Sequence, residues 1–336
     1  MRCYILPEAG SIDALTLVER PDPTPGPRQV LVRVRATSLN YRDLITVEGQ
    51  YARAAPKPDL IPLSDGAGEI VAVGPGVSRL KVGDRVAGCF MQKWIGGTID
   101  EAAQASAMGG AIDGMLTEFA ALEEDGAVLL PGHLSFEEGA TLPCAAVTAW
   151  HALVEIGQLK AGDIVLVQGS GGVSIFALQF ARLFGARVIA TSSSAAKAER
   201  LKKMGAEVVI DYKATPDWDK EAVALTGGKG VDLVVEVGGA GTLPRSFMAA
   251  RLGGRIAVIG LLSGMAQVDP MPILRRNLRV QGLYVGSKQM FDAMNRAIEA
   301  GGLKPVIDKV FPFAEAKAAY RHLKSQQHFG KIVIAH

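Results

Sequence analysis

The first 130 residues alternate short apolar runs with turns that contain glycine and proline, a pattern typical of a strand-rich lobe. Residues 30–38 (VLVRVRATS) alternate apolar and polar positions with the period of two expected of a half-buried strand. Shorter runs follow at 68–74, 84–88, 117–122 and 128–130. Residues 91–114 are rich in alanine and glycine and lack strand periodicity, so we predict a loop there.

From about residue 159 the apolar runs alternate with helical patterns instead. Apolar residues recur from Val173 to Phe184 at the i, i+3, i+4, i+7 spacing of one helix face, and Gly185 is the predicted stop. Strands are predicted at 164–168, 187–191, 208–211, 232–237, 255–260 and 280–285, and further helices at 195–204 and 217–225. This alternation predicts an α/β fold with a parallel, doubly wound sheet. The tail from residue 309 onward is expected to return to the first lobe through a strand, a helix and a last strand at 331–335.

Length and composition predict two lobes and argue against a nucleic-acid-binding or membrane-spanning protein. A chain of 336 residues is long for one core and predicts two lobes. Thirty-six basic and 34 acidic residues give a net charge of +2, without the basic surplus of a nucleic-acid-binding protein. The sequence has no apolar stretch of about 18 residues, so we expect no membrane partner. The cysteines Cys3, Cys89 and Cys144 lack any paired spacing, which favours a reducing compartment and predicts a cytoplasmic location.

A glycine-rich turn, GSGGVS, follows the strand predicted at 164–168 and opens the next helix. Glycines let a backbone approach a pyrophosphate, and the N–H groups of a helix N-terminus stabilise the anion. We therefore predict a dinucleotide site with contacts at Gly169, Gly171, Gly172 and Val173. Ser174 stands where a third glycine is usual, which we expect to set the helix slightly farther from the strand. The alternative is an ordinary strand–helix turn.

The end of the next strand bears on which dinucleotide is bound. NAD usually meets an acidic residue about 20 residues beyond the glycines, and that position is occupied by Thr191. Three serines follow at 192–194, with basic residues close behind, and hydroxyl groups and cations suit a 2′-phosphate better than a carboxylate would. We predict NADP(H), bound at Ser192, Ser193 and Lys197. The alternative is that the serines only cap the next helix and that Lys197 is solvated.

Two later strand ends are also candidate cofactor contacts. In open α/β sheets, ligands bind beyond the carboxyl ends of the strands. We therefore expect two short segments to line the ribose and the nicotinamide, namely Val237, Gly238 and Gly239, and Ile259, Gly260 and Leu261. The alternative is that both are common strand-end turns.

Together these segments resemble the medium-chain dehydrogenase/reductase superfamily over essentially the whole chain. The similar motifs are NYRD at 40–43, PLSDGAGE at 62–69, LPCAAVTA at 142–149, the glycine turn, and GKIV at 330–333. The resemblance implies a GroES-like, mostly β catalytic domain at 1–130, a Rossmann NADP(H)-binding domain at 131–270, an edge strand and return of the chain at 271–336, and an active site between the lobes. We also predict cofactor contacts at Thr148, Tyr212, Val285, Gly286, Gly330 and Lys331.

The same resemblance bears on metal binding. Zinc-dependent alcohol dehydrogenases of the superfamily carry Cys where this chain has Asn40, His where it has Ser64, and a third ligand at Cys144. One thiolate with an amide and a hydroxyl is not a credible zinc site. The four cysteines of the family's structural zinc lobe are missing from 91–114. We therefore expect no bound metal and a zinc-free, quinone oxidoreductase-like branch; the alternative ligands are two carboxylates, Asp43 and Asp65.

Without a Lewis acid, reduction of an acceptor that is already polarised is the easier chemistry. A quinone or an α,β-unsaturated carbonyl needs a positioned hydride, a hydrogen-bond donor for the developing enolate, and a proton. The candidate donors are Asn40, Tyr41 and Tyr51, which follow the first strong strand. We predict an NADPH-dependent reductase of such small molecules, with an alcohol or aldehyde dehydrogenase and a non-catalytic NADPH-binding protein as alternatives. The late apolar strand at 279–285 would sit at a sheet edge and predicts a homodimer.

Overall fold

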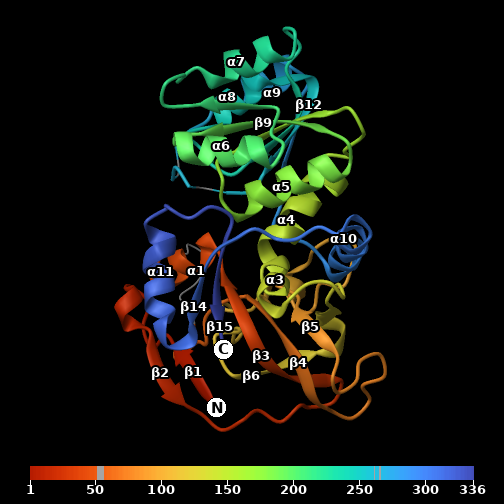
Figure 1. Ribbon diagram of the computed structural model, residues 1–336, viewed down its shortest axis with the longest axis vertical. Coiled ribbons are helices and arrows are strands. Elements are labelled where there is room, and N and C mark those ends of the chain that lie inside the picture. The colour runs from red at the N-terminus through yellow and green to blue at the C-terminus, as the bar shows by residue number, and fades with distance from the viewer. Residues whose placement is uncertain (51–56, 261, 265) are drawn as a thin grey trace. The chain divides into compact units, whose positions relative to one another are not determined.

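The computed structural model describes the chain except for residues 51–56, 261 and 265. The described residues form two compact units (Figure 1). Unit 1 comprises Met1–Val147 and Gly286–His336, and unit 2 comprises Thr148–Val285. Both chain ends therefore belong to the same unit.

Unit 1 is built on a seven-stranded sheet. Along it the strands run in the order β14 (Ile307–Pro312), β15 (Lys331–Ala335), β3 (Gln29–Leu39), β4 (Asp65–Val73), β5 (Arg85–Gly88) and β7 (Ala127–Leu129), and β6 (Phe119–Glu123) also pairs with β3. Strands β14 and β15 are parallel, and the other pairs are antiparallel. A separate hairpin joins β1 (Arg2–Ile5) and β2 (Thr16–Glu19). The mostly β character predicted for this part of the chain is confirmed.

The helices of unit 1 include α1 (Tyr41–Val47), α2 (Glu101–Gln104), α3 (Phe136–Gly139), α10 (Lys288–Gly301) and α11 (Ala316–Lys324), of which α3, α10 and α11 contact strands of the sheet. One apolar core lies between the hairpin, α1, α11 and β15, and includes Leu15, Leu44 and Tyr320. A second lies among β3, β4, β5 and β6 around Val32 and Ile70. The apolar positions of β3 that alternate in sequence are the buried ones, as the period of two predicts.

Unit 2 is a six-stranded parallel sheet. Its strands are β8 (Ile164–Gln168), β9 (Arg187–Ser192), β10 (Val208–Asp211), β11 (Val231–Glu236), β12 (Ala250–Val258) and β13 (Arg279–Gly282). They lie in the order β10-β9-β8-β11-β12-β13 and every pair is parallel. Numbered along the chain this is the order 3-2-1-4-5-6 of the Rossmann fold, which reverses direction between β8 and β11. The predicted fold class is confirmed.

The helices of unit 2 are α5 (Gly172–Leu183), α6 (Ala195–Lys203), α7 (Trp218–Leu225), α8 (Leu243–Ala249) and α9 (Met271–Arg275). Helices α5 and α6 pack on β8, β9 and β10, whereas α7 and α8 pack on each other, on β10 and on β11 and β12 (Figure 1). Helix α5 ends at Leu183, and Gly185 follows with a φ of +74°, as the predicted stop requires.

The boundary between the units differs from the boundaries suggested by sequence, 131 and 271. Residues 131–147 remain in unit 1 because α3 packs on β3, β4 and β5 and the π-helical segment Leu142–Ala146 packs on β4 and β5. Residues 271–285 remain in unit 2 because β13 pairs with β12. Among the described residues, no helix is long and apolar enough to span a lipid bilayer.

Candidate active site

The glycine turn begins at the carboxyl end of β8. Gly169 has a φ of +73°, in the left-handed region that favours glycine. Gly171 caps α5 with a φ of −75°, which any residue can adopt. A Cβ atom added at either position would meet no atom of the described residues within 4 Å. Backbone geometry thus explains the glycine at 169, but neither the backbone nor the packing of the chain explains the one at 171.

Ser174 stands where a third glycine is usual, and its side chain makes a hydrogen bond that a glycine could not make. Its buried hydroxyl donates to the carbonyl of Gln168 at the end of β8, over 2.6 Å. The side chain that enlarges this position therefore also ties α5 to the strand. The sequence indicated that a serine is tolerated, and the structure shows the hydrogen bond that accommodates it.

The predicted phosphate contacts lie at the end of β9 and the start of α6, and the predicted cofactor contact Tyr212 follows the neighbouring strand β10. Ser192 ends β9 and is paired in register with Asp211 of β10, and Tyr212 follows with an exposed ring. Ser194 caps α6 by accepting from the backbone N–H of Lys197 at 3.4 Å, so capping accounts for one serine of the three. The backbone N–H of Ser194 also donates to the Ser192 hydroxyl at 3.3 Å.

The turns after β11 and β12 pack tightly on each other. A Cβ atom at Gly260 would lie 2.1 Å from the carbonyl oxygen of Val237, so only glycine fits there. The N–H of Ile259 donates to the Glu236 carbonyl at 2.8 Å. The predicted contacts Gly169, Gly171, Ser192, Val237 to Gly239, Ile259 and Gly260 therefore lie along one edge of the sheet, beyond the carboxyl ends of parallel strands.

A second group of polar side chains lies inside unit 1, around Lys331. Lys331 begins β15 and lies next to the end of β3, because Ile332 pairs with Leu39. Its side chain is 3% exposed, and its Nζ donates to the Leu39 carbonyl at 2.6 Å and to Asn40 Oδ1 at 2.5 Å. The carboxylate of Asp65 lies 3.8 Å from the same nitrogen. The structure thus places the predicted cofactor residue Lys331 against the candidate catalytic residue Asn40.

Two buried aspartates flank this group. Burial raises the pKa of Asp65, while Lys331, Asn40, Ser64 and the Cys144 amide lower it. The Ser64 hydroxyl donates to Asp65 Oδ1 at 2.7 Å. Burial also raises the pKa of Asp43 to about 6, opposed by the Arg42 guanidinium and reinforced by the negative charge of Asp65. In both carboxyl groups, desolvation is the main cause of the raised pKa. Shifted pKa values of this kind are common at functional sites.

The backbone that carries Ser64 is held in an unusual conformation. Leu63 is fully buried with a φ of +69°, which is strained for a residue with a branched side chain. Two glycines of the 91–114 segment pack against its backbone, since a Cβ at Gly114 would lie 2.0 Å from the Leu63 carbonyl oxygen and one at Gly109 2.6 Å from its carbonyl carbon. The glycine-rich segment therefore fixes the strand end on which Ser64 and Asp65 sit.

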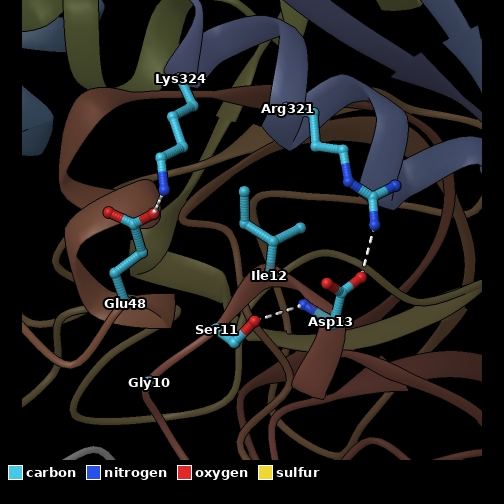
Figure 2. Close-up of a pocket in the computed structure, with 7 residues that line it drawn as sticks. All are labelled: Gly10, Ser11, Ile12, Asp13, Glu48, Arg321 and Lys324. Carbon is cyan, nitrogen blue, oxygen red and sulfur yellow. Dashed lines mark hydrogen bonds and ion pairs between the residues drawn. The ribbon is translucent and has the colours of Figure 1, made fainter.

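A pocket of about 220 Å³ lies elsewhere in unit 1, between α11 and the segment before β2 (Figure 2). Its two cations are each paired with a carboxylate: Arg321 with Asp13, and Lys324 with Glu48. Because its charges are compensated and it contains none of the predicted site residues, we assign it no ligand.

Comparisons with known proteins match the two units to one enzyme family. Residues 26–132 match the alcohol dehydrogenase GroES-like domain, and residues 172–300 match the zinc-binding dehydrogenase family. A zinc-type alcohol dehydrogenase-like protein of Schizosaccharomyces pombe is 46% identical, covering 92% of this chain and 91% of the relative. A quinone oxidoreductase of Rattus norvegicus is 31% identical over 93% of this chain and 90% of the relative.

The chain belongs to the medium-chain dehydrogenase/reductase superfamily. Within it the chain groups with the quinone oxidoreductase-like branch, and it is an oxidoreductase of this superfamily. A solved mycobacterial structure complexed with NADPH is 28% identical, covers both chains fully and superposes with a TM-score of 0.84. This likeness supports a nicotinamide cofactor.

The residues present do not fit the zinc ion that the superfamily implies. Asn40 Oδ1 already accepts from the Lys331 ammonium, and the Ser64 hydroxyl donates to Asp65. Burial, together with the charge of Asp65, raises the pKa of the Cys144 thiol, which disfavours the thiolate that zinc requires. Within the described ranges, no set of three or more His, Cys, Asp or Glu side chains is arranged to hold a metal ion.

The remaining predicted site residues fall in several places. Tyr41 begins α1 with an exposed ring. Thr148 is buried in the short helix α4 (Val147–Trp150), and the Val285 carbonyl accepts from His151 Nδ1 at 2.8 Å. Gly286 and Gly330 belong to unit 1. A Cβ at Gly286 would clash with Val147, and one at Gly330 would clash with Val306. Tyr51 and Leu261 lie outside the described residues.

Sequence reasoning missed two residues at the edge of unit 2 where the cofactor contacts are predicted, Gln168 and Glu236. Both end apolar strands of a parallel sheet that is buried on both faces. The signal was available in the run VDLVVEVGG, because the second of its two carboxylates, Glu236, follows three apolar residues of a buried strand and needs partners.

Proposed function

We propose that this protein is an NADPH-dependent reductase that transfers hydride to a quinone or an α,β-unsaturated carbonyl without zinc. The observation that carries the cofactor assignment is the glycine at 171, which the fold itself does not need. A glycine there leaves the backbone N–H groups at the start of α5 accessible to a pyrophosphate. The bound nicotinamide would supply the hydride.

The preference for the 2′-phosphate rests on the residues at the end of β9 and the start of α6. Thr191 stands where a carboxylate would repel the phosphate, and Ser193 and Lys197 are partly exposed at the start of α6. Asp211 lies on the neighbouring strand, but its Oδ1 accepts from the amides of Lys213 and Ala214 at 2.9 and 3.3 Å. That carboxylate therefore accepts from its own turn, and Lys197 of α6 is the cation that we propose contacts the phosphate.

The proposed class of hydride acceptor follows from the polar side chains that unit 1 offers as hydrogen-bond donors. An alcohol substrate needs an electrophile that stabilises an alkoxide, and zinc does not fit Asn40, Ser64 and Cys144. A conjugated carbonyl arrives polarised and needs only a donor for its developing negative charge. The chain offers the Asn40 carboxamide, the exposed Tyr41 phenol and the buried positive charge of Lys331 for that purpose.

The test is an acceptor panel run on protein treated with a chelator. We expect NADPH to be oxidised by quinones or enones at a rate that the chelator does not change, with little activity from NADH. Alcohol-dependent reduction of NADP⁺ that requires added zinc would instead show an alcohol dehydrogenase. Tight NADPH binding without turnover on any acceptor would show the non-catalytic alternative.

We also propose a homodimer in a reducing compartment such as the cytoplasm. Strand β13 lies at an edge of the unit 2 sheet, where a second copy can pair with it, and Leu274 of the neighbouring helix α9 is exposed. All three cysteines are buried and free. Light scattering that finds only monomer at micromolar concentration would contradict the dimer.

A further inference from the structure

Two buried polar side chains end the two strands between which the sheet of unit 2 reverses its order. Gln168 is the last residue of β8 and is 6% exposed, and Glu236 is the last residue of β11 and is fully buried. Gln168 Nε2 donates to Glu236 Oε2 at 2.7 Å. The pair therefore bridges the place where ligands of doubly wound sheets bind.

Glu236 is held entirely by uncharged donors. Its Oε2 accepts from Gln168 and from the Ser246 hydroxyl, and its Oε1 accepts from the amides of Gly238 and Gly239 at 2.8 and 2.9 Å and from the Thr242 hydroxyl at 2.5 Å. A buried carboxylate is costly unless its oxygens are hydrogen-bonded. Two of these donors are backbone N–H groups of the turn that follows β11, so the carboxylate fixes the shape of that turn.

Gln168 links the same turn to the glycine turn. Its Oε1 accepts from the amides of Val237 and Gly238 at 3.1 and 3.2 Å. Its backbone carbonyl accepts from Ser174 in α5, and the next residue in the chain is Gly169. One side chain thus sets the spacing between the segment predicted to hold the pyrophosphate and the segment predicted to line the nicotinamide.

The Val237–Gly239 turn is tightly packed, so it could not easily adjust to the loss of the Glu236 carboxylate. A Cβ at Gly238 would lie 2.3 Å from Thr242 Oγ1, and the Gly238 carbonyl accepts from the Ser263 hydroxyl at 2.6 Å. Its amides are directed at Glu236 and Gln168 and do not point outward. Loss of the carboxylate would leave several buried amides and hydroxyls without acceptors, and the turn would have to shift.

We propose that Glu236 and Gln168 are positioning residues that hold the Val237–Gly239 turn in the geometry required by the nicotinamide half of the cofactor. The inference rests on the proposed NADPH binding. It predicts that disturbing the pair weakens binding of the whole dinucleotide but not of its adenosine half, because the adenosine end is assigned to β9 and α6.

The test compares two ligands by calorimetry: NADPH, and adenosine 2′,5′-bisphosphate, which carries the 2′-phosphate but no nicotinamide. We expect Glu236→Gln to weaken NADPH at least about tenfold while leaving the bisphosphate within about twofold. The variant Glu221→Gln, at an exposed position of α7, is the matched control and should change neither affinity.

Two further variants distinguish a loss of positioning from a folding defect. The double exchange Gln168→Glu with Glu236→Gln keeps one carboxylate and one amide at the switch point and should restore much of the NADPH affinity. Thr242→Val removes a single donor with little change of shape and should weaken NADPH slightly in the same sense. Thermal melting establishes that each variant is folded before titration.

The outcomes separate the two proposals. Unchanged NADPH affinity in folded Glu236→Gln protein, or equal losses for both ligands, would overturn the positioning role. Wild-type protein that binds neither ligand would overturn the proposed function, and the positioning role would fall with it.

Discussion

Asp43 should make the stability of the protein fall as pH rises through the mildly acidic range, and Asp43→Asn should remove that dependence. The Asp43 side chain is 1% exposed and lies in α1, next to the candidate catalytic residue Asn40. It accepts from the Asn40 amide at 2.8 Å and from the Arg42 guanidinium at 3.3 Å. These contacts only partly offset its burial, which raises its pKa from 3.8 to about 6.

The size and sign of the effect follow from the two pKa values. Below about pH 4 the carboxyl is protonated in both the folded and the unfolded chain. Between about pH 4 and pH 6 the unfolded chain releases its proton first, so the folded state loses stability until its own pKa is passed. A shift of about two units corresponds to about 3 kcal/mol. An asparagine at this position does not titrate and carries no such loss.

The assay is denaturant unfolding of wild type and Asp43→Asn across this range. We expect the free energy of unfolding of the variant, relative to wild type, to rise by about 3 kcal/mol between about pH 4 and pH 7. Asp59→Asn is the matched control because Asp59 is exposed in a left-handed conformation that asparagine accepts. A difference that stays flat with pH, or that falls, would show that Asp43 does not have a raised pKa in the folded protein.

Three further predictions concern other buried or charged side chains. Gln92→Leu should lower the free energy of unfolding by about 3 kcal/mol, because the Gln92 side chain bonds the Cys89 and Gly126 carbonyls and an amide of β6; a loss below about 1 kcal/mol in denaturant would contradict this. Lys331→Met should cost about 3 kcal/mol or more by leaving the Asp65 charge unpaired, and adding Asp65→Asn should recover part of the loss in a double-mutant cycle. Lys197→Ala should reduce the kcat/KM preference for NADPH over NADH about tenfold, and an unchanged ratio would argue against a phosphate contact.

The local pattern of apolar residues and turns was sufficient to predict much of the fold. Strands β8, β10 and β15 have the bounds that the apolar runs predict, because a short apolar run between turns has few other arrangements. Strand β13 ends at Gly282, before the end of its apolar run, because β12, the strand with which it pairs in the described sheet, ends at Val258. Strand β12 begins at Ala250, earlier than predicted, because its first residue pairs across a bulge with Val231.

The candidate site could be predicted only where its contacts are local. The glycine turn and the serines after β9 lie within a few residues of the strand ends that place them. The contact between Lys331 and Asn40 joins residues that are 291 positions apart, so no window of sequence reveals it. The link between Gln168 and Glu236 depends on which strands are neighbours in the sheet, and it becomes visible only once the strand order is known.

Isotope labelling can follow the transferred hydride itself. Chelator-treated protein is mixed with an α,β-unsaturated ketone and NADPH in which both hydrogens at C4 of the nicotinamide are deuterium, and the product is examined by mass spectrometry and NMR. We expect one deuterium at the β-carbon of the saturated ketone, with product formed at the same rate with and without the chelator. Product that carries no label, or label transfer only after zinc is restored, would contradict it.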